Sequence, residues 1–166
     1  MAGPSARNSE VDVMEIFLFR HAVAEAEAQS GRDQDRALTG RGARRMERAV
    51  SGLERHGVGF QLLLHSPWLR AVQTAELLTP LLDGLTQVSL ELAQPPTQAL
   101  LDQFQGEAVA VVGHQPWLGE LAGMLLGGEG HRIEWRKGGL VWLRGEPKPG
   151  GACVVAVLPP RVLRGM

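Results

Sequence analysis

The chain alternates short apolar runs with longer stretches whose apolar residues recur at helical spacing, and this alternation limits the possible folds most strongly. The clearest apolar run covers residues 108–113, AVAVVG, and is typical of a strand buried on both faces of a sheet. Strands that alternate with helices favour an α/β domain with a largely parallel sheet. A length of 166 residues fits one such domain.

The predicted elements follow this alternation along the chain. Strands are expected at residues 14–19, 61–65, 87–91 and 108–113. Helices are expected from a cap at Thr39 to a stop near Gly57, from Pro67 in a first turn onward, and over residues 117–126. Residues 140–143 and 153–158 differ in character and are predicted to form an antiparallel hairpin at one sheet edge. Together these elements predict a single-domain, three-layer α/β/α fold.

Composition narrows the setting in which the chain works. Residues 1–13 are polar and lack the apolar centre of a signal peptide, so we expect a disordered extension before a domain at residues 14–166. A net charge of −1 gives no reason to expect nucleic acid or an anionic membrane as partner. No apolar run is long enough for a membrane span, and the expected location is the cytoplasm.

The chain has one cysteine, Cys153, in the apolar run ACVVAVL. One cysteine excludes an intramolecular disulfide and a zinc site of several cysteines. We expect this residue to be buried in a strand, with a nucleophilic role as the alternative.

Polar residues gather where three of the predicted strands end. Arg20 and His21 follow the first strand, Ser66 and Arg70 follow the second, and His114 follows the long apolar run. The carboxyl ends of parallel strands line the ligand crevice of open α/β sheets. Two histidines and two arginines are therefore expected on one rim of the sheet.

This set of side chains suits phosphoryl transfer. Arginine offers a planar fork of donors that matches phosphate oxygens. Neutral His21 can attack phosphorus while a protonated His114 stabilises the transferred group, and the neighbouring guanidinium groups should lower the pKa of His21. Cationic side chains supply the positive charge, so no metal is required.

Four segments, in order along the chain, resemble the histidine phosphatase superfamily. FLFRHAVAE at residues 17–25 is similar to its RHG signature, and RALTGRG at 36–42 to the segment that opens its first helix. HSPWLRAVQTAELL at 65–78 and AVVGHQPWLGELA at 110–122 resemble the segments that hold the second arginine and the second histidine. The resemblance implies a phosphoglycerate mutase-like fold. The short length and the ending are similar to the small SixA-type phosphohistidine phosphatases. No segment of this chain is long enough to form a separate lid insertion.

The resemblance also implies residue roles. His21 would accept the phosphoryl group, and Arg20, Arg70 and His114 would form the phosphate pocket, with Ser66 beside them. Ala22 departs from the signature, which has glycine there, and would matter if the backbone needed positive φ. The general acid is left open between Glu91, at the end of the third predicted strand, and Asp33, in the loop before the first long helix.

The expected activity is hydrolysis of a phosphorylated substrate through a phosphohistidine on His21. A missing lid and a weak acid signal favour phosphohistidine on a protein, because a phosphorylated imidazole depends little on a general acid. A small phosphate ester remains an alternative substrate. A silent phosphate-binding module and a mutase are disfavoured, the first by the complete set of histidines and arginines and the second by the short chain.

Two surface features have two interpretations each. The arginines of the first long helix are expected to form a solvated face, with orientation of an acidic partner as the alternative. Trp68 and Trp117 either line the entrance of the site or pack as partly buried residues.

Overall fold

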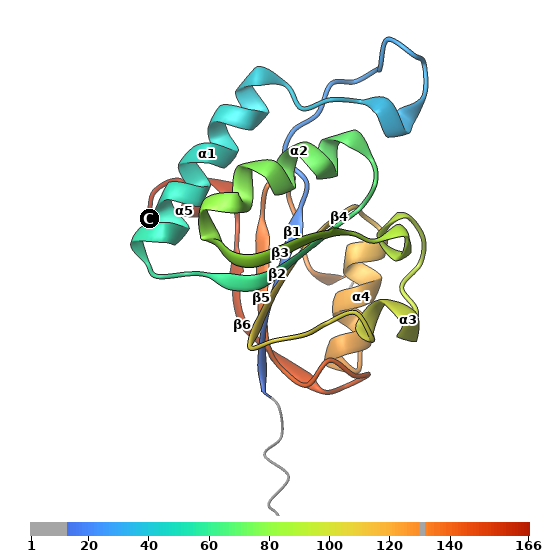
Figure 1. The fold of residues 1–166 in the computed structure, drawn as a ribbon, viewed down its shortest axis with the longest axis vertical. Coiled ribbons are helices and arrows are strands. Elements are labelled where there is room, and N and C mark those ends of the chain that lie inside the picture. Colours follow the sequence, from blue (N-terminus) through green and yellow to red (C-terminus); the bar gives the residue numbers. More distant parts are fainter. Residues whose placement is uncertain (1–12, 130–131) are drawn as a thin grey trace, which may run out of the picture.

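A single mixed sheet organises the chain in the computed structural model, which describes residues 13–129 and 132–166 (Figure 1). Within these residues the sheet has six strands in the order β3-β2-β4-β1-β5-β6. The strands are β1 (Met14–Arg20), β2 (Phe60–His65), β3 (Leu82–Val88), β4 (Ala108–Gly113), β5 (Leu140–Gly145) and β6 (Ala152–Leu158). β1, β2, β3 and β4 run parallel, whereas β5 and β6 are antiparallel and form one edge.

Helices cover both faces of this sheet, which gives the predicted three layers (Figure 1). α1 (Gly40–Arg55), α2 (Leu69–Leu78) and α5 (Pro160–Leu163) lie on one face, and α3 (Gln98–Leu101) and α4 (Trp117–Leu126) lie on the other. Short 3₁₀ turns at Asp33–Asp35, Thr79–Leu81 and Leu90–Ala93 complete the described elements. No helix in the described part of the chain is long and apolar enough to cross a membrane.

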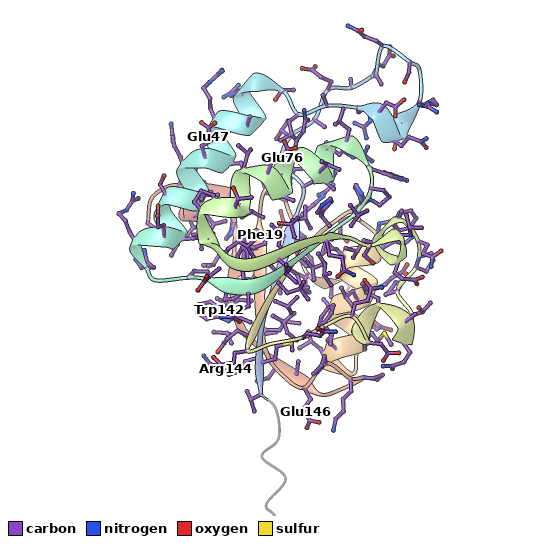
Figure 2. The ribbon with its side chains drawn as sticks, viewed as in Figure 1. Phe19, Glu47, Glu76, Trp142, Arg144 and Glu146 are labelled. Atoms are coloured by element: carbon purple, nitrogen blue, oxygen red, sulfur yellow. The ribbon has the colours of Figure 1, made fainter. Side chains whose placement is uncertain are left out.

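The side chains on the two faces of the central strands belong to two separate hydrophobic clusters. In β1, Ile16 and Leu18 pack toward α3 and α4, while Phe17 and Phe19 pack toward α1 and α2. Every residue of β4 is buried, so its run is apolar throughout rather than alternating. Figure 2 shows Phe19 near the centre of the molecule, while Glu47 extends from the outer helix layer.

The register of the three central strands brings their carboxyl ends level. β4 lies between β1 and β2, with Arg20 paired to Gly113 on one side and His65 paired to Val112 on the other. Residues that directly follow these strands therefore meet at one edge of the sheet.

Most predicted elements are confirmed, but the third strand was wrongly placed. It covers Leu82–Val88, and residues 90–93 form a 3₁₀ turn instead. Asp83 and Gly84 have the character of a turn, yet they pair with β2 because the glycine fits where a Cβ would lie 2.0 Å from the Gln61 carbonyl oxygen. That close approach is a tertiary contact, and local sequence does not reveal it.

Two further predictions need correction, and one lies outside the description. α2 begins at Leu69, so Pro67 precedes the helix; Trp68 takes the cap position. Cys153 is exposed rather than buried, because it lies on the outer edge strand β6. The predicted extension at residues 1–13 lies outside the described residues except for Val13, which is exposed.

Candidate active site

Three residues that directly follow strands form the core of a polar site, as the sequence predicts. His21 follows β1, Ser66 follows β2 and His114 follows β4. Backbone bonds fix this approach, since the N–H of His21 donates to the Gly113 carbonyl and the N–H of Ser66 donates to the Val112 carbonyl, both over 3.1 Å. The rings of the two histidines lie 5.2 Å apart between centroids.

The tautomer of His21 is set by its own backbone. Its Nδ1 lies 2.7 Å from the Ala22 carbonyl oxygen and donates to it, which leaves the lone pair on Nε2. Arg70 Nε donates to that Nε2 over 3.3 Å. The N–H of Ala22 donates to Thr74 Oγ1 over 3.0 Å, which ties this segment to α2. No residue other than glycine in the described chain has a positive φ, so alanine at position 22 introduces no backbone strain.

His21 is held neutral. Burial lowers its pKa most, and the charges of Arg70, Arg20 and Lys137 lower it further, to about 4. The hydrogen bond to the Ala22 carbonyl opposes this shift without cancelling it. A neutral imidazole near pH 7 retains the lone pair that a nucleophile needs.

His114 is the second buried histidine. Its Nε2 lies 2.7 Å from Ser66 Oγ, and its buried Nδ1 finds no partner among the described residues. Burial lowers its pKa most, followed by the effects of His21 and Arg70, to about 3. The ring is therefore neutral near pH 7, and the expectation of a protonated His114 is limited to a state in which a bound anion raises that pKa.

Arg70 joins His21 to the first candidate acid. Its side chain is buried at the start of α2, and its Nη2 donates to Asp33 Oδ2 over 3.0 Å. Burial tends to raise the pKa of Asp33, but hydrogen bonds from Arg70 and Arg36 outweigh it and lower that pKa below its usual value. Asp33 is thus an ionised carboxylate within the site rather than a ready proton donor at neutral pH.

Glu91, the other candidate acid, has hydrogen-bond partners different from those of Asp33. It follows β3 in the 3₁₀ turn Leu90–Ala93, where its Oε2 accepts hydrogen bonds from Gln94 over 2.8 Å and Thr97 over 3.1 Å. It lines a small cavity together with His114. The structure therefore places Glu91 beside the second histidine and Asp33 beside the second arginine.

Arg20 brings in a residue that the sequence analysis missed. Its Nη1 donates to the Trp135 carbonyl over 2.6 Å, while its buried Nε has no partner in the described part of the molecule. Lys137 stands nearby; burial and the charges of Arg20, Arg36 and Arg70 lower its pKa. No motif surrounds Lys137 in the sequence. It reaches the site because the N–H of Gly138 donates to the carbonyls of Arg20 and His21, both over 3.0 Å.

Trp68 and Trp117 form an aromatic wall beside His114. The ring centroid of Trp68 lies 4.6 Å from that of His114 and 5.7 Å from that of Trp117. The guanidinium carbon of Arg70 stands 4.7 Å from the centre of the Trp68 ring. Both tryptophans are half-buried, so they border the site and keep one side in contact with solvent.

The site therefore combines neutral histidines with a surplus of fixed cations. The charges of Arg20, Arg70 and Lys137 all act on His21, and the carboxylate of Asp33 is bonded to Arg70 and Arg36. Such a pocket favours a small anion with several oxygens. The described residues contain no group of three or more His, Cys, Asp or Glu side chains that could hold a metal ion.

Comparison with known proteins gives the family and the fold of the chain. Residues 16–94 match the model of the histidine phosphatase superfamily (branch 1). An uncharacterised protein of Picosynechococcus sp. is 37% identical over 140 residues, which cover 79% of this chain and 85% of that protein. The protein histidine phosphatase SixA, solved in complex with tungstate, superposes with a TM-score of 0.76 at 26% identity, over 90% of this chain and 99% of that one.

A more distant match agrees in fold alone. The phosphoserine phosphatase of Entamoeba histolytica has a TM-score of 0.69 at 14% identity, over 90% of this chain and 99% of that one. The chain belongs to the histidine phosphatase superfamily, and its architecture matches that of the SixA-type phosphohistidine phosphatases.

Proposed function

We propose that this chain is a phosphohydrolase that carries the phosphoryl group on His21 during turnover. One observation carries the proposal: the Nε2 lone pair of neutral His21 points toward the guanidinium of Arg70. A nucleophile beside a fork of phosphate-binding donors is the arrangement that in-line phosphoryl transfer needs.

The reaction has two steps. In the first, Nε2 of His21 forms a bond to phosphorus as the bond to the leaving group breaks, while Arg20 and Arg70 bind the phosphoryl oxygens. His114, with Ser66 at its Nε2, becomes a donor once the phosphate dianion raises its pKa. In the second, water attacks phosphorus and the P–N bond breaks, with Asp33 or Glu91 moving the proton.

Phosphohistidine on a protein is the proposed substrate. The leaving imidazole is planar and suits the wall that Trp68 and Trp117 build beside His114. A P–N bond to imidazole is activated and needs little help from a general acid, which agrees with an Asp33 held ionised. The similarity to SixA, named a protein histidine phosphatase, supports the same substrate class.

The test compares wild type with His21→Ala, using radiolabelled acetyl phosphate in the presence of a chelator. Phosphate release and an acid-labile, base-stable label on wild type alone are expected. The matched control is His56→Ala. His56 is exposed and directly follows α1, so this variant should keep both signals. Release by a folded His21→Ala at the wild-type rate would overturn the covalent mechanism.

Substrate class needs a second comparison. The value of kcat/KM for a phosphohistidine peptide should exceed the values for phosphoserine and for sugar phosphates. A preference for one of the small esters would instead establish the alternative, a phosphatase of a small phosphate ester.

A further inference from the structure

A second, larger groove lies beside the site and shares Lys137 with it. It has a volume of about 600 Å³ and runs between α1, α5 and the turn that contains Lys137. Its ionisable lining is five cations and one acid: Arg45, Arg136, Lys137, Arg161, Arg164 and Glu134.

The positive charge of this groove is local. The whole chain has a net charge of −1, so the cations are concentrated rather than spread evenly. The acid of the groove, Glu134, is bonded to Arg136 over 3.2 Å, which leaves the other cations without an acid in the lining. Burial and the charges of Arg45, Arg48 and Arg41 lower the pKa of Arg164, as crowded like charges do. Such a surface favours a polyanionic partner.

Tertiary packing brings these cations together from distant parts of the chain. α5 lies directly on α1, because Gly52 has no side chain at a point where a Cβ would be 2.3 Å from the Leu163 carbonyl oxygen. This contact puts Arg161 and Arg164 next to Arg45. The arginines of α1, which resemble a solvated helix face in sequence, thus form one wall of a groove.

The groove opens next to the nucleophile. Val23, two residues beyond His21, lines it, and so does Lys137, whose charge lowers the pKa of His21. A chain lying in the groove would therefore place a neighbouring residue close to the site.

We propose that the groove binds an acidic segment of the phosphorylated protein substrate, an inference that rests on the proposed function. Its size exceeds that of a single phosphate, and apolar residues share its lining with the cations: Val23, Pro159, Pro160 and Val162. Mixed apolar and basic walls fit a polypeptide that carries carboxylates among apolar side chains, better than a small, fully polar anion.

The experiment measures binding separately from turnover. A fluorescein-labelled peptide that alternates Glu with Leu, and a neutral version with Gln in place of Glu, are titrated with the protein while anisotropy is followed. The groove variant is Arg161→Glu with Arg164→Glu. The control variant, Arg44→Glu with Arg55→Glu, makes the same change in net charge at exposed positions of α1 outside the groove lining.

The acidic peptide is expected to bind wild type and the control variant alike, to bind the groove variant about tenfold or more weakly, and to lose affinity as salt is added. All variants should hydrolyse acetyl phosphate at the wild-type rate, which shows that the site is intact. Equal weakening in both variants, or equal binding of the neutral peptide, would overturn the proposal. Tighter competition by inorganic triphosphate than by the unlabelled acidic peptide would also overturn it, in favour of a small anion.

Turnover distinguishes the two proposals. The substrates are two phosphohistidine peptides, one with a flanking acidic segment and one with the neutral Gln version of that segment. The acidic segment should lower KM for wild type and not for the groove variant. Binding of the acidic peptide without hydrolysis of any phosphohistidine peptide would contradict the proposed function alone.

Discussion

The Nε of Arg70 donates a hydrogen bond to Nε2 of His21 over 3.3 Å, although the two residues are 49 positions apart in the chain. The bond identifies which ring nitrogen carries the lone pair, and it places a phosphate-binding fork beside that nitrogen. The position of Arg70 is fixed in turn by Asp33 and by the face of Trp68.

Replacing Arg70 by Lys should lower kcat with acetyl phosphate by about 10²- to 10³-fold, because a single ammonium cannot reproduce two parallel N–H bonds to the phosphoryl group. Steady-state kinetics and a thermal melt check this. Arg32→Lys makes the same chemical change at an exposed ion pair with Asp35 and should leave kcat unchanged. An Arg70→Lys variant with wild-type kcat would remove Arg70 from the phosphate pocket.

The two buried histidines should make the fold less stable in mild acid. Their pKa values are lowered to about 4 for His21 and about 3 for His114, so the unfolded chain takes up protons near pH 6.5 that the folded protein refuses. Stability is therefore fully present above pH 6.5 and is lost as pH falls toward 4. The loss at pH 5 should be about 2 kcal/mol for each histidine.

Denaturant unfolding at pH 7 and pH 5 measures this effect. A His21→Gln, His114→Gln double variant should lose much less stability over the same interval than wild type, whereas His56→Gln should behave as wild type. An equal loss in the double variant would show that other groups cause it.

Replacing Asp33 by Asn should strengthen binding of inorganic phosphate several-fold, because the carboxylate occupies Nη2 of Arg70 and repels an approaching anion. The inhibition constant of orthophosphate against acetyl phosphate hydrolysis reports this. Asp35→Asn removes a carboxylate that bonds to Ser30 and Arg32 instead, and should change the constant little. Weaker phosphate binding by the Asp33→Asn variant would mean that Asp33 chiefly positions Arg70.

Replacing Glu91 by Gln should lower kcat selectively for substrates with poor leaving groups. As proton donor beside His114, Glu91 should speed hydrolysis of an alkyl phosphate by about 10²-fold, and hydrolysis of acetyl phosphate or phosphohistidine much less. The ratio of kcat values across this series is the measurement, with Glu120→Gln on the exposed face of α4 as control. A uniform loss across all donors would indicate a structural role through Gln94 and Thr97.

Much of the fold could be predicted because the decisive signals are local. β4 and α4 have the bounds that the sequence indicates, since a continuous apolar run and a helical period ending in a left-handed glycine, Gly127, are properties of short segments. The same locality identified Arg20, His21, Arg70 and His114 at the ends of strands and at a helix start.

The wrong predictions concern elements whose environment lies elsewhere in the chain. Cys153 has the neighbours of a buried strand residue, but its strand is the outermost of the sheet. β3 begins earlier than predicted because its pairing with β2 outweighs the turn character of Asp83 and Gly84. Lys137 has no motif around it and reaches the site through the backbone bonds of Gly138.

The sequence by itself determined the order of strands and helices, the phosphate chemistry of the strand ends and the family resemblance, because each depends on residue types at short spacing. The tertiary structure alone decided that Arg70 reaches Nε2 of His21, that Asp33 is bonded to Arg70, and that arginines of α1 and α5 share a groove. These are contacts between residues far apart in the chain, and distance, burial and register set them only once the sheet has formed.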